Sequence, residues 1–123
     1  MKDNVVKDKS LEFAVRIVNL YKFLVNEQKE FVMSKQILRS GTSIGANIRE
    51  AEQAQSRADF INKLNIALKE ANETEYWLEL LIRTEYITRE QYESINNDST
   101  EINKLLISCL LYTSPSPRDA HES

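Results

Sequence analysis

Hydrophobic residues recur every three or four positions in four separate stretches of this chain, which is the spacing of one apolar face of an α-helix. The first stretch, residues 10–28, carries two adjacent rows of this kind. Two rows make the wide apolar face that a helix in a bundle requires, so we expect both to face the core. One row consists of Leu11, Ala14, Val18, Tyr21 and Val25, and the other of Phe13, Ile17, Leu20 and Leu24.

The second stretch, residues 34–55, contains both glycines of the chain. Glycine is a poor helix former, but its small size lets a neighbouring helix approach closely, and we expect that role for Gly41 and Gly45. The alternative is a phosphate-binding loop, which requires further glycines and a Lys-Ser/Thr pair after a strand; the sequence lacks both features. The apolar row consists of Ile37, Gly41, Ile44, Ile48 and Ala51.

The third stretch, residues 56–83, has the longest regular row, whereas the fourth, residues 88–108, has a polar centre where we expect the helix to fray or kink. Short links make consecutive helices antiparallel, so we predict an all-α fold: an antiparallel up-down-up-down four-helix bundle. Ser10, Ser34, Ser56 and Thr88 are the expected N-caps, and Thr88 with Gln91 fits a capping box. The third row is Phe60, Leu64, Ala67, Ala71, Thr74, Leu78 and Leu81, and the fourth is Tyr92, Ile95, Ser99, Ile102 and Leu106.

We expect three parts in the chain: a flexible N-terminus at residues 1–9, the bundle at residues 10–108, and a disordered tail at residues 109–123. The tail holds the only cysteine, both prolines and the only histidine of the chain. Its first eleven residues, CLLYTSPSPRD, resemble the translation of a transposase-based sequencing adapter, so we interpret Cys109 and His121 as non-native. The helical pattern itself continues through CLLY, which predicts a helix as far as Tyr112.

Composition and charge indicate the cellular compartment of the protein and the kinds of partner it could bind. The polar N-terminus is not a signal peptide and no apolar run approaches the roughly 20 residues of a membrane span, so we expect a cytoplasmic protein without a membrane partner. The net charge of −3 conceals a split. Residues 1–69 carry 12 Lys and Arg against 8 Asp and Glu, whereas residues 70–108 carry 3 against 9. This split indicates either a polyanion-binding face or two faces that attract each other between subunits.

Catalytic constellations are scarce in the sequence. Without the tail, the chain has neither His nor Cys to pair with a serine. We therefore expect that the protein has no enzymatic activity and binds no cofactor. A carboxylate-only metal site on Glu50, Glu70 and Glu73 is the alternative, because hard cations accept all-oxygen ligands. We favour a structural role instead, in which these carboxylates, Asn47 and Asn72 are satisfied at helix contacts.

A modest basic patch is the strongest indication of a ligand in the residues themselves. Such side chains would hold phosphates without reading bases. An ordinary solvated surface is the alternative, because the patch has neither interleaved aromatic residues nor a recognised motif. The five basic residues are Lys35, Arg39, Arg49, Arg57 and Lys63.

The runs RSGTSIGANIREA, SRADF and ALKEANETEYWL resemble one bacterial family. Its members are small four-helix bundles encoded within 23S rRNA intervening sequences, and they are related to the accessory variability proteins of diversity-generating retroelements. The resemblance implies a ribosomal-protein-like, non-enzymatic homo-oligomer, commonly a pentamer, that binds structured RNA or DNA and, in the retroelement branch, a reverse transcriptase. That branch is strongly basic, so the slightly acidic chain favours the rRNA branch. The expected packing and oligomer residues are Gly41, Ile44, Gly45, Asn47, Ile48, Phe60, Leu64, Ala67, Ala71 and Trp77.

A protein-binding module without any nucleic-acid role is the second hypothesis. Its contacts would come from the aromatic side chains near the end of the third stretch and the link after it: Tyr76, Trp77 and Tyr86.

Overall fold

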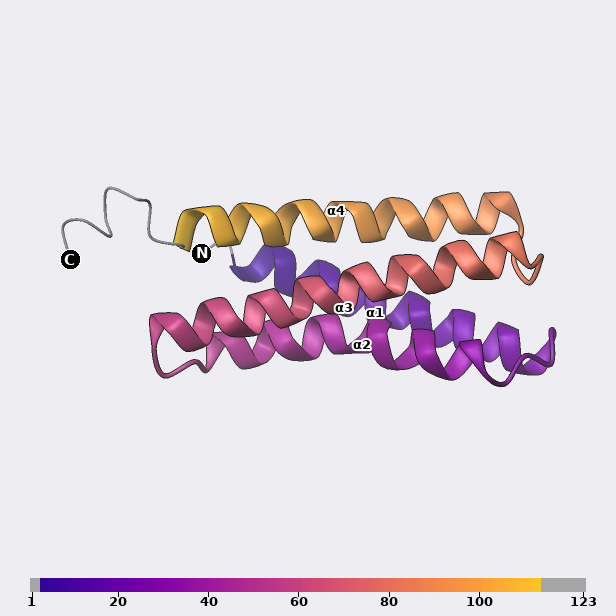
Figure 1. Cartoon of the computed structure of the whole chain (residues 1–123), viewed down its shortest axis with the longest axis horizontal. Coiled ribbons are helices and arrows are strands. Elements are labelled where there is room, and N and C mark those ends of the chain that lie inside the picture. Colours follow the sequence, from indigo (N-terminus) through magenta and orange to yellow (C-terminus); the bar gives the residue numbers. More distant parts are fainter. Residues whose placement is uncertain (1–2, 114–123) are drawn as a thin grey trace.

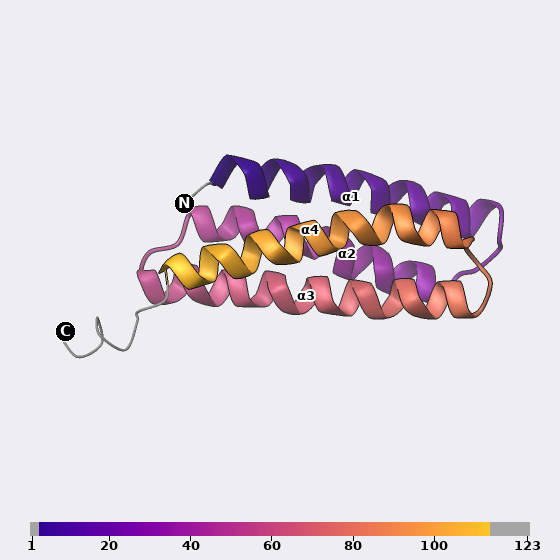
Figure 2. The same ribbon diagram turned by 90° about the horizontal axis from the view of Figure 1, so that it is seen from above.

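The structure, a computed structural model, describes residues 3–113, which form four α-helices joined by short links. The helices are α1 (Asp3–Asn26), α2 (Met33–Glu52), α3 (Arg57–Arg83) and α4 (Arg89–Thr113). The α1–α2 and α3–α4 links lie at one end of the bundle and the α2–α3 link lies at the other, so consecutive helices are antiparallel (Figures 1 and 2). The predicted all-α fold is confirmed.

One row of side chains from each helix builds the core. The predicted rows of α2 and α3 are buried from Ile37 to Ala51 and from Leu64 to Leu81, while Phe60 at the start of α3 is only partly buried. The row of α4 is buried from Ile95 to Leu106, and Tyr92 packs against its edge. The polar centre of α4 does not interrupt the helix. It is held by neighbours, because the hydroxyl of Ser99 donates to the Glu75 carboxylate at 3.3 Å and Asp98 pairs with Arg16.

Only one of the two apolar rows of α1 reaches the core, so the prediction for the other row is wrong. Phe13, Ile17 and Leu24 are fully buried, whereas Leu11 is 50% exposed and its neighbour Val15 is 55% exposed. The reason lies in the bundle geometry: α1 contacts only α2 and α4, and its contact with α4 is the least extensive of the four helix contacts. One helix side is enough to fill these two contacts.

The packed part of the chain is longer at both ends than predicted. Residues 3–9 of the expected flexible N-terminus are helical instead, because α1 begins at Asp3 and Val6 is 1% exposed in the core. At the other end, α4 reaches Thr113 and Cys109 is buried, because Cys109 continues the row of Ile102 and Leu106. The helix therefore confirms the prediction of a helix as far as Tyr112 and passes the bundle boundary expected at 108, and the remainder of the predicted tail, 114–123, lies outside the described residues.

Side-chain caps at the helix starts agree with two of the four predictions. The Ser56 hydroxyl accepts the Asp59 N–H at 3.0 Å, and Thr88 and Gln91 form both bonds of the capping box, at 2.8 and 3.1 Å. Ser10 and Ser34 are not N-caps. Ser10 lies inside α1, where its hydroxyl donates to the Lys7 carbonyl at 2.8 Å.

Glu30 caps α2 in place of Ser34. Its buried carboxylate accepts the backbone N–H groups of Val32, Met33 and Ser34 at 3.2, 3.0 and 2.7 Å, so it satisfies donors that the helix itself leaves open. The Ser34 hydroxyl donates back to the Glu30 carbonyl at 2.9 Å. A negative charge at this position also suits the helix dipole.

Helix α3 ends in a C-terminal cap that contains no glycine. Glu85 takes the left-handed conformation with φ 67°, and the N–H groups of Glu85 and Tyr86 donate to the carbonyls of Ile82 and Leu81, both at 3.0 Å. This is the Schellman arrangement, in which glycine usually occupies the left-handed position.

The close approach of α1 and α2 depends on Gly41. A Cβ atom at this position would lie 2.7 and 2.8 Å from two carbons of Ile17, both close to the backbone of a fully buried side chain. Gly45 is less constrained, because its nearest neighbour is the Ser10 hydroxyl at 3.2 Å. The small-residue role predicted for Gly41 is therefore confirmed within the single chain.

Gly41→Ala should lower the free energy of unfolding. Overpacking of a filled core costs about 1–3 kcal/mol, which outweighs the roughly 1 kcal/mol that alanine gains over glycine in a helix. Urea unfolding followed by circular dichroism measures the difference. The control, Gly45→Ala, should be neutral or stabilising; equal stability of the two variants would contradict the packing role of Gly41.

Candidate nucleic-acid interface

Arg39, at the centre of the predicted basic patch, is occupied by carboxylates. Its guanidinium extends from α2 to α3, where it lies 3.2 Å from Glu70 and donates a hydrogen bond to Glu73. The hydrogen bond to Glu73 is the main cause that raises the pKa of Arg39 above its ordinary value. Arg39 therefore joins two helices and offers little unbalanced positive charge to a polyanion.

Glu73 receives a second donor from its own helix. The indole N–H of Trp77 donates to the Glu73 carboxylate at 3.0 Å, and the Trp77 ring meets Tyr76 edge to face with centroids 5.1 Å apart. The hydrogen bond from Trp77, followed by the one from Arg39, lowers the pKa of Glu73 below its ordinary value. The structure thus places Trp77 in a network within the chain, whereas Tyr76 remains 60% exposed.

The other four basic residues of the patch divide into engaged and outward-facing side chains. Lys63 lies 2.9 Å from Glu50, and this hydrogen bond raises the pKa of Lys63. Lys35 and Arg49 are exposed on α2 and form no ion pair or hydrogen bond with the described residues. Arg57 is exposed at the start of α3. The predicted patch is therefore interrupted by carboxylates.

The same ion pairs weaken the case for a metal site. Glu70 and Glu73 face Arg39 and Glu50 faces Lys63, so the three carboxylates do not converge on one point. Within residues 3–113, no three acidic, histidine or cysteine side chains are grouped closely enough to hold a metal ion.

Most of the predicted packing residues serve the core of a single chain. Ile44, Ile48, Leu64, Ala67 and Ala71 are fully buried. Next to them, the Thr74 hydroxyl lies 2.9 Å from the Ser40 hydroxyl, which joins α2 and α3 inside the core. Gly41 of that set is buried as well. The other members, and the aromatic Tyr86, are partly buried: Gly45, Asn47, Phe60, Trp77 and Tyr86.

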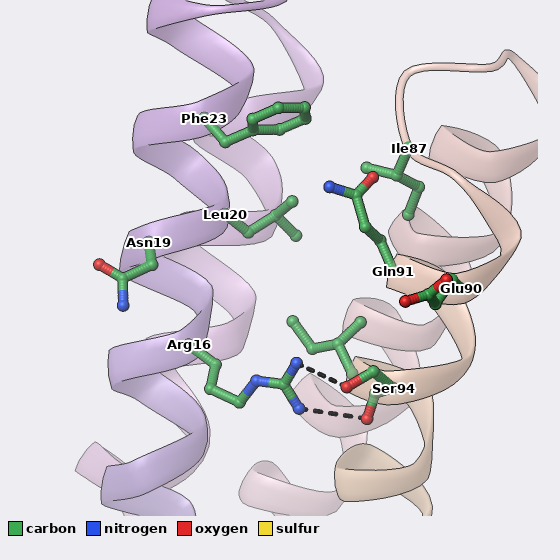
Figure 3. Close-up of a pocket in the computed structure, with 9 residues that line it drawn as sticks. Arg16, Asn19, Leu20, Phe23, Ile87, Glu90, Gln91 and Ser94 are labelled. Carbon is green, nitrogen blue, oxygen red and sulfur yellow. Dashed lines mark hydrogen bonds between the residues drawn. The ribbon is translucent and has the colours of Figure 1, made fainter.

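A shallow groove of about 420 Å³ lies between α1 and the start of α4. Figure 3 shows Leu20 and Phe23 of α1 facing Ile87 and Gln91 across it, and Arg16 closing one end. Arg16 is occupied by three hydrogen bonds, to the Ser94 carbonyl and hydroxyl at 3.2 and 2.9 Å and to Asp98 at 2.7 Å. Ser94 and Glu90 both line the groove, and the Ser94 hydroxyl is held by Arg16.

The comparisons with known proteins establish the family. The family model described as "23S rRNA-intervening sequence protein" matches residues 2–108. The chain belongs to this family. It is similar to a crystal structure, at 1.70 Å resolution, of a protein of unknown function from the S23 ribosomal protein family of Bacteroides thetaiotaomicron VPI-5482. The identity is 98% over 89% of this chain and 98% of the other, with a TM-score of 0.88.

A comparison with curated proteins and a search for membrane-spanning helices both give negative results. No curated protein matches this member of the family. Within residues 3–113, none of the four helices has the length and hydrophobicity that crossing a membrane requires.

Glu73→Gln should reduce the dependence of stability on pH in acid. Because the pKa of Glu73 is lowered by folding, its contribution is complete above the unfolded-state pKa of about 4.3 and is lost as the pH falls through the folded-state pKa. Thermal unfolding from pH 6 down to pH 3 should show that wild type loses its advantage over Glu73→Gln across this window. The control is Glu27→Gln, at an exposed carboxylate, and an identical pH profile for the two variants would contradict the assignment.

Proposed function

We propose that this protein is a non-enzymatic scaffold that assembles from several copies of the chain and associates with RNA. The observation that carries the assembly is the outward apolar row of α1. Leu11 of this row and the adjacent Val15 are half exposed, and Ala14, Val18 and Tyr21 continue the row as partly buried side chains. From residue 11 to residue 25 the row spans about 21 Å of helix. Continuous apolar surface of this kind is typical of an interaction site.

A second copy of the chain is the partner that the sequence and the charge distribution favour. The family resemblance implies a ring, commonly of five copies. In addition, residues 1–69 are net basic and residues 70–108 are net acidic, so unlike faces of adjacent copies attract each other. We therefore assign the outward row of α1 to a contact between subunits.

RNA is the ligand that family membership supports, since the family is described by 23S rRNA intervening sequences. Lys35 and Arg49 supply outward positive charge for phosphate contacts, and a ring would multiply these contacts and raise avidity. The acidic net charge favours this role over that of a reverse-transcriptase accessory subunit.

Val15→Lys should reduce the mass of the protein in solution. A lysine beside the apolar row places a charge in the proposed contact and leaves the core untouched, so circular dichroism should report unchanged helix content. Light scattering after size-exclusion chromatography measures the mass. The control is Asn19→Lys, an exposed position one turn further along α1. A monomeric wild type would contradict the assembly, and equal masses of both variants and an oligomeric wild type would contradict the assignment of the contact to α1.

Wild type should bind a labelled RNA hairpin from 23S rRNA in a filter-binding assay, with affinity that falls as salt rises. Replacing Lys35 and Arg49 by alanine should weaken binding and lower the slope of log K against log salt by about one for each lost phosphate contact. Absence of binding at low salt would refute the RNA role. Retention of a protein partner instead of RNA by the tagged wild type would then favour an interaction module.

A further inference from the structure

The outer face of α3 carries a second, regular row of polar side chains. Asn62, Asn65, Lys69, Asn72 and Tyr76 follow one another at steps of three and four, so they lie along one line of the helix. All five are exposed. The three asparagines and Lys69 form no hydrogen bond or ion pair with the rest of the described chain, so the helix contact predicted for Asn72 is wrong. The row therefore has its full hydrogen-bonding capacity available to a ligand.

Asparagine is an unexpected residue at these positions. It is a weaker helix former than the residues that normally cover an exposed helix face, because its side chain competes for backbone hydrogen bonds. Asparagine is useful at helix ends, but all three of these lie inside the 27-residue helix. Three such residues lie in one row, and none has a partner among the described residues. They lower the stability of the helix and form no contact that would offset this loss. This points to a role in recognition.

Three carboxylates of α3 near this row are held by neighbouring helices, and the exposed Glu79, one turn beyond Tyr76, pairs with Arg83 at 3.2 Å. Glu70 and Glu73 face Arg39 on α2, and Glu75 accepts hydrogen bonds from Asn103 and Ser99 on α4, at 2.6 and 3.3 Å. On an acidic protein, the outer face of α3 from Asn62 to Tyr76 thus offers only neutral amides, one ammonium and one phenol. A polyanion meets no opposing carboxylate within this row.

We infer that the outer face of α3 binds the sugar–phosphate backbone of RNA. Amide side chains donate to phosphate oxygens and both donate to and accept from the ribose 2′-hydroxyl, and Lys69 supplies the charge. Tyr76, held edge to face against Trp77, offers a ring for stacking with an unpaired base. The inference rests on the RNA-binding function proposed above and names its surface, which differs from the α2 residues Lys35 and Arg49.

The test compares two pairs of substitutions with the same chemistry and the same spacing. Asn62→Ala with Lys69→Ala alters the α3 row, and Asn97→Ala with Lys104→Ala makes the matched change on exposed positions of α4. Both pairs remove one amide and one positive charge seven residues apart. Binding to the labelled 23S rRNA hairpin is measured over a range of salt, together with the thermal midpoint and the mass in solution.

The α3 pair should weaken hairpin binding roughly tenfold or more and lower the salt slope by about one, while the α4 pair stays close to wild type. The thermal midpoint of the α3 pair should not fall, because alanine is a better helix former than asparagine. Lost binding therefore cannot be attributed to unfolding. Tyr76→Leu should also weaken binding to a hairpin with an unpaired loop.

Equal binding by the two pairs, with wild type bound to RNA, would overturn the α3 surface but leave the RNA function standing. A wild type that fails to bind the hairpin would refute the RNA function itself. A change in the mass of the α3 pair would show that a second copy of the chain covers the row, which also overturns the inference.

Discussion

The bundle depends on small side chains where α2 meets its two neighbours. Gly41 leaves room for Ile17 of α1, and on the other side the Ser40 hydroxyl meets Thr74 of α3 in the core. Ala67 and Ala71 keep the facing surface of α3 equally shallow. Close helix axes allow more apolar contact per residue and exclude water from the hydroxyl pair, so a short chain can bury a continuous core. The α2–α3 contact is accordingly the most extensive in the structure.

The outer helices are held by a different kind of interaction. Across the α1–α4 contact, Lys9 pairs with Glu101 at 2.8 Å and Arg16 pairs with Asp98 at 2.7 Å. Exposed ion pairs of this type contribute little to stability. The packing between these two helices is also limited, because a shallow groove lies between them. The molecule therefore combines a tightly packed centre with outer faces whose side chains lie outside the buried core. In the function we propose, those faces bind a second copy and RNA.

The sequence predicts the features of this fold that arise from local rules. The apolar rows of α2 and α3, the cap at Ser56 and the capping box at Thr88 depend only on spacing and on residue type, and the structure contains all of them. The outward turn of Leu11 could not be predicted in this way, because spacing gives the width of an apolar face and not the number of neighbours that cover it. The cap by Glu30 was missed because glutamate is not a usual N-cap residue.

The candidate site was harder to predict for the same reason. Arg39 and Lys63 look available in the sequence, but carboxylates 13 to 34 residues away reach them once α2 and α3 are side by side. Conversely, the row from Asn62 to Tyr76 has no recognisable motif, and it attracts attention only when its three asparagines and Lys69 are found exposed and without partners among the described residues. Pairing of charges is a tertiary property, and the chain order of residues does not reveal it.

Hydrogen exchange of the full-length protein is the most direct test of the claim that the α2–α3 contact organises the bundle. The slowest amides should lie on α2 near Ser40 to Ile48 and on α3 near Ala67 to Leu78, where exchange requires global unfolding. The interior amides of α4 should exchange faster through partial opening of its less extensive contacts. Protection in α4 that equals or exceeds that of α2 and α3 would contradict this account.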